Sequence, residues 1–105
     1  MALLSVTYDL PSGGPSPDYA ERVGKMLQDM LKQPGLKEFR GYRNPLKVSP
    51  HVLTQSEWED LESITAYLKT DVYDRIMQEM SALGCANIAI SIWDASPVTP
   101  EPIRP

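Results

Sequence analysis

Hydrophobic and polar residues alternate along four short stretches of this chain, at 2–9, 36–43, 51–58 and 86–94. Successive side chains of a β-strand point to opposite faces, so this alternation predicts four strands. Residues that favour strands, such as Val, Ile, Thr and Tyr, are frequent in the first and last stretches. The second stretch carries the most charge, which is typical of an edge strand.

Apolar residues recur with helical spacing in three further stretches, which predicts helices over 17–31, 61–68 and 72–83. Proline is tolerated at the first helical position, Ser and Asp suit the N-cap, and glycine suits the position after a helix. The expected N-caps are Ser16, Asp60 and Asp71, and the expected stops are Pro34-Gly35 and Gly84.

The order of these elements is β-α-β-β-α-β, with the second helical unit broken in two. This is the order of the split βαβ or ferredoxin-like arrangement. We therefore predict an α+β protomer with a four-stranded antiparallel sheet and its helices on one face, over residues 1–94. Residues 95–105 are predicted to form an extended tail, because the prolines in this segment exclude a helix or an inner strand.

The second face of this sheet has no helix to cover it. In the first strand Leu4, Val6 and Tyr8 form one row, and the opposite row, with Ser5 and Thr7, is smaller but mostly uncharged. A sheet that is apolar on both faces must bury both. We therefore expect a homodimer in which the first and last strands of two copies meet, giving a dimeric α/β barrel.

Composition and charge exclude several classes of function. The chain has 105 residues, a net charge of -4 and a pI of about 4.8, which argues against nucleic-acid binding. A single Cys85 and a single His51 exclude a disulfide and a zinc site built from the chain alone, and Cys85 is expected in the core. No apolar run is long enough to cross a membrane, and the first residues lack the basic start of a signal peptide, so we expect a cytoplasmic protein.

Four basic residues around the second strand are interpreted as a solvated edge, with an anion site as the alternative: Lys32, Lys37, Arg40 and Arg43.

Three segments carry a resemblance to a known family: Pro34-Gly-Leu-Lys-Glu-Phe39, Thr54 to Asp60, and Ala66-Tyr-Leu-Lys-Thr-Asp-Val-Tyr73. They resemble the antibiotic biosynthesis monooxygenase (ABM) family of the dimeric α/β-barrel superfamily, over roughly residues 2–94. This resemblance implies the same fold and pairing. Members of such families include quinone-forming oxygenases that need no cofactor, haem-degrading oxygenases and proteins of unassigned role.

The haem-degrading members carry an Asn, an aromatic residue and a haem-ligating His, and the resemblance places these positions on Thr7, Tyr67 and Met77. The stretch 72–83 contains no His, and Met is a poor sole ligand for haem iron. We therefore expect that the protein does not degrade haem and that it uses no cofactor.

Two hypotheses for function follow. In the first, an aromatic or polycyclic small molecule binds between the sheet and the helices, and the protein is a monooxygenase that needs no cofactor. In the second, the same fold is a non-catalytic dimeric binding or regulatory module. A buried titratable group in an open pocket would favour the first, and a pocket filled by Met26, Met30, Met77 and Met80 would favour the second.

The candidate catalytic residues are Tyr67, His51 and Thr7, and the candidate substrate-binding residues are Thr7, Trp58, Tyr67, Met77 and Trp93. Thr7 belongs to this site only if the small row that it shares with Ser5, Ala89 and Ser91 faces the helices. The alternative is that the aromatic residues form the core and the dimer interface, and that His51 is a surface residue at a strand end. The acidic residues between Glu57 and Glu62 are interpreted as partners of a helix N-terminus.

Overall fold

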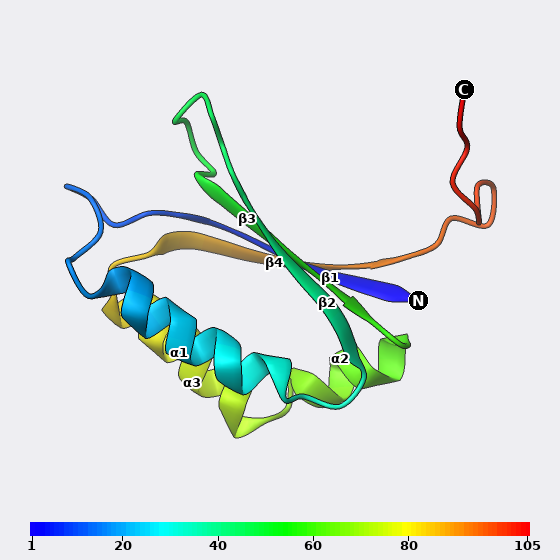
Figure 1. Cartoon of the computed structure of the whole chain (residues 1–105), viewed down its shortest axis with the longest axis horizontal. Helices are drawn as coiled ribbons and strands as arrows, with labels where there is room; N and C mark the ends of the chain where they lie inside the picture. The colour runs from blue at the N-terminus through cyan, green and yellow to red at the C-terminus, as the bar shows by residue number, and fades with distance from the viewer.

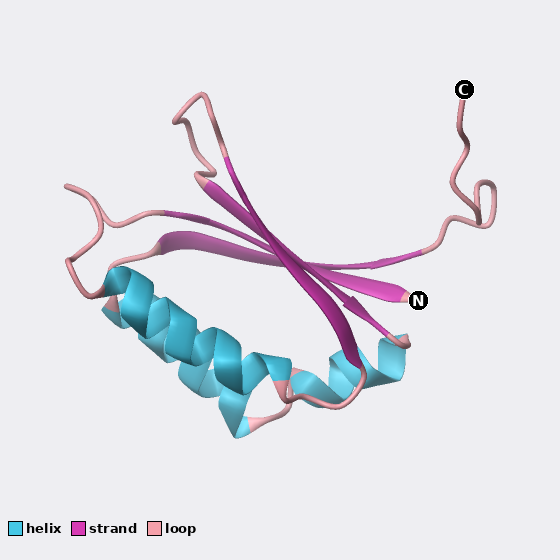
Figure 2. Ribbon diagram, viewed as in Figure 1, coloured by secondary structure: helices cyan, strands magenta, loops and turns pink.

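A single sheet with helices on one side forms the body of the molecule (Figures 1 and 2). The computed structural model describes residues 1–105. In chain order the elements are β1 (Ala2–Asp9), α1 (Tyr19–Leu31), β2 (Leu36–Arg43), β3 (Val52–Trp58), α2 (Leu61–Tyr67), α3 (Asp71–Ala82) and β4 (Ala86–Asp94).

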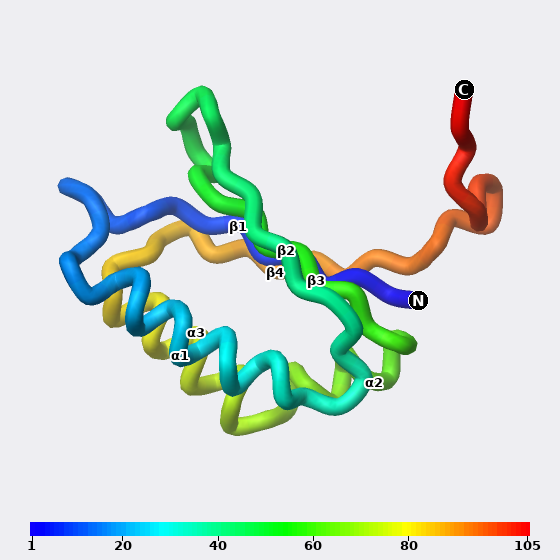
Figure 3. Tube along the Cα trace, in the orientation of Figure 1, coloured from blue at the N-terminus to red at the C-terminus, as the bar shows by residue number.

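The four strands lie in the order β2-β3-β1-β4, and each neighbouring pair is antiparallel. All three helices cover the same face of the sheet, and the opposite face is bare (Figure 1). The predicted ferredoxin-like fold is therefore confirmed. The β2–β3 connection projects away from the helices, and residues 95–105 run out from the end of β4 with every residue exposed (Figure 3).

The larger row of β1 faces the helices. Ala2, Leu4 and Tyr8 are buried, so Leu3, Ser5 and Thr7 point to the bare face, which we call the outer face. The register pairs Leu4 with Ile92 and Val6 with Ile90, and it pairs Leu3, Ser5 and Thr7 with Trp93, Ser91 and Ala89. The isoleucine row of β4 is thus on the helix side, and the small row is on the outer face.

The outer face is not apolar throughout. On β1 and β4 the paired residues from Leu3 to Thr7 and from Ala89 to Trp93 carry no charge. On β2 and β3, Glu38 pairs with Glu57 and Arg40 with Gln55. Across this second half of the sheet, the expectation of two apolar faces is wrong, and the homodimer stays a prediction.

The core divides into two groups of buried side chains. One surrounds the fully buried Trp58 and Ile64 and includes Leu4 and Tyr67. The other joins Tyr8 to Met80, Leu83 and Cys85 near the opposite end of the sheet. Cys85 is buried and unpaired, as expected.

The turns at the helix ends decide how α1 and α2 meet the sheet. Asp60 caps α2 as predicted, because its Oδ1 accepts from the Ser63 N–H at 2.8 Å. Gly35 has a φ of +87°, and a Cβ there would lie 2.3 Å from Ser63 Oγ, so only glycine fits this turn. The close approach holds the start of β2 against α2.

Two other predicted caps are wrong by one or two residues. The N-cap of α3 is Thr70, whose Oγ1 accepts from the Tyr73 N–H at 3.2 Å, and Asp71 is the first helical residue. The helix α1 begins at Tyr19 after Asp18, and the Ser16 hydroxyl donates to Asp18 instead of capping the helix. No helix here is both long enough and apolar enough to span a lipid bilayer.

Candidate functional site

A cavity of about 220 Å³ lies between the sheet and the helices. The lining is almost entirely apolar, and it contains no charged residue. From the sheet it is lined by Leu4, Val6 and Tyr8 of β1, Phe39 and Gly41 of β2, and Val52, Thr54 and Ser56 of β3; from the helices it is lined by Val23, Met26, Leu27 and Met30 of α1, Tyr67 of α2, and Tyr73, Ile76, Met77 and Met80 of α3.

Small residues on the sheet leave the room for this cavity. Gly41 on β2 pairs with Thr54 on β3, and both line the floor. A Cβ placed on Gly41 would meet no heavy atom within 4 Å, so the space above it is open. The next pair on the same face is Phe39 with Ser56, and both residues also line the cavity.

Two aromatic rings, Tyr67 and Tyr73, line one end of the cavity, and Trp58 stands behind Tyr67. The Tyr67 ring stacks on the Trp58 ring with centroids 5.0 Å apart and planes 30° apart. The Tyr73 ring meets Tyr67 edge-on at 5.5 Å. Trp58 is held from behind, because its Nε1–H donates to Ser56 Oγ at 2.8 Å and that hydroxyl donates to the Leu4 carbonyl at 3.3 Å. The position of Tyr67 is therefore fixed by packing on two sides.

The Tyr67 hydroxyl is a free polar group near this end. The residue is only 4% exposed, yet its hydroxyl makes no hydrogen bond within the chain. Because no fully buried polar side-chain atom lacks a partner, this hydroxyl must reach open space. Tyr67 lines both this cavity and a polar hollow beside Asp60 and Ser63, so its hydroxyl is available to bind a group in one of these two spaces.

The tyrosines of the cavity stay protonated at ordinary pH. Burial, with a smaller effect of Tyr73, raises the pKa of Tyr67 to about 12. Burial also raises the pKa of Tyr8 and of Tyr73. With no His, carboxylate or Lys in the lining, the cavity can offer neutral hydroxyl donors but no base that works near neutral pH.

Two of the predicted site residues line the cavity, namely Tyr67 and Met77. Thr7 and Trp93 do not, because both lie on the outer face of the sheet. Trp93 is 56% exposed there, and its Nε1–H donates to Ser5 Oγ at 2.8 Å. The condition for placing Thr7 in this site is therefore not met, since the sheet separates it from Tyr67.

Trp58 and His51 are also placed differently from the expectation. Trp58 stands behind Tyr67 as part of the core and does not touch the cavity. His51 lies just before β3, where its Nδ1 accepts from the Leu10 N–H at 3.0 Å, 3.8 Å from the Asp9 carboxylate. It ties the end of β1 to β3 and is outside the cavity, so it has no substrate there to act on.

Sequence reasoning missed the residues that give the cavity its size. Gly41 inside a strand was a signal that could have been used, because an isolated glycine there often marks a close approach or open space. The methionines Met26, Met30, Met77 and Met80 all line the cavity but do not fill it.

Haem does not fit this donor set. The cavity offers thioethers such as Met77 but no imidazole or thiolate, and the one His of the chain is committed elsewhere. No group of three or more His, Cys, Asp or Glu side chains is arranged so that it could hold a metal ion. We therefore derive no chemistry from a bound porphyrin or metal.

Comparison with known proteins gives a consistent picture. The family model described as "Antibiotic biosynthesis monooxygenase" matches residues 3–79. No curated protein matches the chain.

Among solved structures, a candidate antibiotic biosynthesis monooxygenase from Deinococcus radiodurans is similar with a TM-score of 0.70 and 17% identity, covering 99% of this chain and 97% of the other. SnoaB from Streptomyces nogalater, a cofactor-independent oxygenase, is similar with a TM-score of 0.66 and 13% identity over 95% of each chain. A dabb family protein with a ferredoxin-like fold from Mesorhizobium loti has a TM-score of 0.73 and 13% identity, covering 89% of this chain and 94% of the other. At these identities the likeness shows the fold alone.

Proposed function

The chain belongs to the antibiotic biosynthesis monooxygenase family, and from this premise we propose that it binds a small aromatic molecule in the cavity and oxidises it with O₂ without a cofactor. The observation that carries the proposal is Tyr67, which lines the aromatic end of a mostly apolar cavity and whose hydroxyl has no hydrogen-bond partner within the chain. A flat ring could stack there and receive one hydrogen bond. The volume of about 220 Å³ is below the usual range for drug-sized ligands, which favours a small ring system.

The chemistry requires an electron-rich substrate. An activated methylene beside a phenolic ring loses a proton to give a carbanion, which reduces O₂. The methylene becomes a ketone, one oxygen atom enters the product and the other leaves as water, so the substrate itself supplies every electron. The cavity holds no base, and we propose that the proton leaves to water while Tyr67, as a neutral donor, stabilises the resulting oxyanion.

The lack of a base also favours a second candidate. A non-catalytic binding module needs only the shape of the cavity and one hydrogen-bond donor, and the lining supplies both. The two candidates bind the same class of ligand. They differ in whether the bound molecule is consumed.

The test is oxidation of 1,8-dihydroxyanthrone, followed by O₂ uptake and by absorbance of the quinone product. We expect turnover above the uncatalysed rate, and we expect Tyr67→Phe to lower it by about 10- to 100-fold, the usual value of a hydrogen bond to a charged group. Tyr42→Phe is the matched control, because Tyr42 is 45% exposed and lies outside the cavity. Saturable binding without turnover would reject the oxygenase and leave the binding module.

We further propose that the outer face is covered by a second copy of the chain. The uncharged row on β1 and β4, with the exposed Trp93 at its end, supports this pairing, and a two-fold axis would bring two such rows together. The cytoplasmic location expected from the sequence stays a prediction.

A further inference from the structure

A polar groove runs between α1 and α3 beside the cavity. Arg22, Lys25, Met26 and Asp29 line it from α1, and Val72, Arg75, Ile76 and Glu79 line it from α3 at the same helical spacing. Met26 and Ile76 line both the groove and the cavity. Met26 and Ile76 therefore stand between the two spaces, and a ligand that parts these two side chains would reach from the groove into the cavity.

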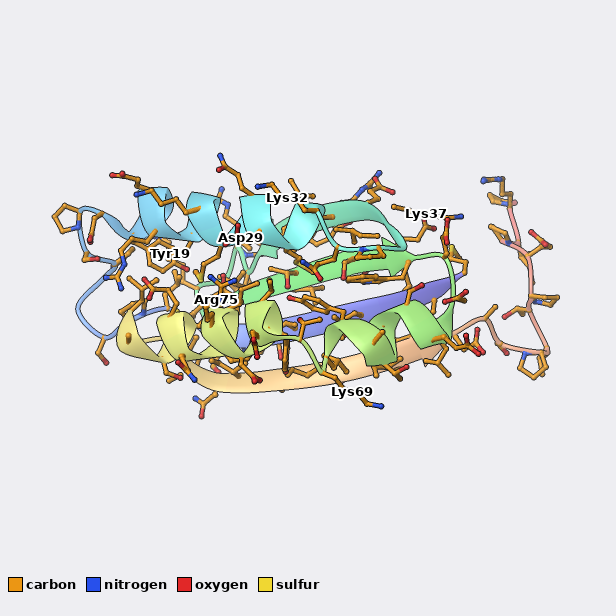
Figure 4. All side chains as sticks on the ribbon, turned by 90° about the horizontal axis from the view of Figure 1, so that it is seen from below. Tyr19, Asp29, Lys32, Lys37, Lys69 and Arg75 are labelled. Atoms are coloured by element: carbon orange, nitrogen blue, oxygen red, sulfur yellow. The ribbon has the colours of Figure 1, made fainter.

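This groove has an excess of basic side chains, although the whole chain is acidic. The chain has a net charge of -4, whereas the groove holds three basic side chains and two acidic ones. Arg22 is committed to an ion pair with Glu79, and Lys25 lies 3.5 Å from Glu21. Arg75 makes no ion pair or side-chain hydrogen bond, although Asp29 stands on the opposite wall (Figure 4). Its guanidinium is thus the one cation of the groove without an ion-pair partner.

From this arrangement we infer that the ligand is an aromatic acid, whose rings enter the cavity while its anionic group stays in the groove at Arg75. The inference rests on the proposed function, because it needs the cavity to accept the rings. An ionised acid inside the cavity would have no charged partner and would lose its hydration, so it must remain outside. The guanidinium suits a carboxylate or sulfonate because it presents two parallel N–H donors.

The experiment compares two fluorescent probes with the same rings. The sulfonate is 8-anilinonaphthalene-1-sulfonate, and the neutral partner is N-phenyl-1-naphthylamine. We expect Arg75→Gln to lower the affinity for the sulfonate by about two- to fivefold, the range for an exposed ion pair. The affinity for the neutral probe should not change. The ratio of the two affinities should also shrink as salt is added, since the contact is exposed.

Two controls locate the binding. Lys69→Gln removes an exposed cation that lines neither space, and it should change neither affinity (Figure 4). Gly41→Leu places a side chain in the cavity and should weaken both probes by tenfold or more. If that variant does not fold, Met77→Trp fills the same cavity from α3.

The outcomes separate the two proposals. A neutral probe that does not bind, or that binds equally well to the filled variants, would overturn the proposed function and this inference with it. A neutral probe that binds in the cavity, with a sulfonate affinity that Arg75→Gln leaves unchanged, would overturn this inference alone. If Arg75→Gln lowers the affinity for the sulfonate alone, the result supports both the proposed function and this inference.

Discussion

Filling the cavity from Gly41 should stabilise the protein while removing its binding site. Gly41 lies in the strand β2, faces the cavity and has open space where a side chain would stand. The first carbon of a side chain at this position meets no atom within 4 Å, and Gly41→Ala is the matched control because its methyl group leaves most of the cavity empty. The two variants separate the effect of the backbone from the effect of filling.

The magnitude follows from two contributions. Replacing glycine in a strand by alanine stabilises by about 0.5–1 kcal/mol, since the unfolded chain loses freedom. Gly41 is exposed in the natural chain, so each further carbon of leucine contributes at most about 0.8 kcal/mol where the cavity buries it, and fixing the side chain costs about 0.5–1 kcal/mol. We expect Gly41→Leu to exceed Gly41→Ala by about 1–2 kcal/mol, which raises the melting temperature by roughly 4–8 °C for each kcal/mol at this chain size.

Thermal unfolding followed by circular dichroism measures the stability, and calorimetric titration with a neutral aromatic ligand measures binding. Gly41→Leu should melt highest and bind least, with Gly41→Ala between it and the natural chain in stability. A lower melting temperature for Gly41→Leu than for Gly41→Ala would mean that the space is not there. Unchanged binding in a more stable Gly41→Leu would mean that ligands bind elsewhere.

Three further results are expected. Ser56→Ala should lower the free energy of unfolding by about 1–3 kcal/mol in urea titration, because the buried Trp58 Nε1–H would lose its acceptor; a change below the error would show that the hydrogen bond contributes nothing net. Trp93→Asp should stay folded but sediment as a monomer where the natural chain sediments as a dimer, and a monomeric natural chain would refute the pairing. The raised pKa of Tyr67, about 12 against 10.0 for a free tyrosine, contributes stability that is complete below pH 10 and is lost as the pH rises to about 12, because the unfolded chain ionises first. Tyr67→Phe should lose less stability over that interval in alkaline unfolding curves, and equal losses would contradict the assignment.

The strands and their order were predictable because alternation and the turn at Gly35 leave few choices of topology. The direction of the faces was not, since Leu3, Ser5 and Thr7 form a row almost as neutral as Leu4, Val6 and Tyr8. The row that faces the helices is the one with more apolar area to bury, and this is the row of Leu4, Val6 and Tyr8. Thr70 and Asp71 are neighbours that both suit an N-cap, so sequence alone could not choose between them.

Sequence reasoning could predict a site residue that projects from an amphipathic helix. It could not predict the cavity volume, which depends on how the layers pack. Tyr67 follows from its place beside the apolar stripe of α2. The open volume depends on Gly41 standing opposite helices that do not close over it, which is a property of the packed layers. His51 was attractive as the single imidazole, but its ring nitrogen is committed to the Leu10 N–H.

The two tryptophans of the chain stand in opposite surroundings, and this has a practical consequence. Trp58 has no exposed surface and touches the tyrosine at the end of the cavity, whereas Trp93 is largely in water on the other side of the sheet. A soluble quencher such as iodide will reach Trp93 in the single chain and not Trp58, and a second copy on the outer face would shield Trp93. The unlabelled protein therefore carries two separate optical reporters, so that occupation of the cavity and contact at the outer face can be followed in one sample as independent changes in emission.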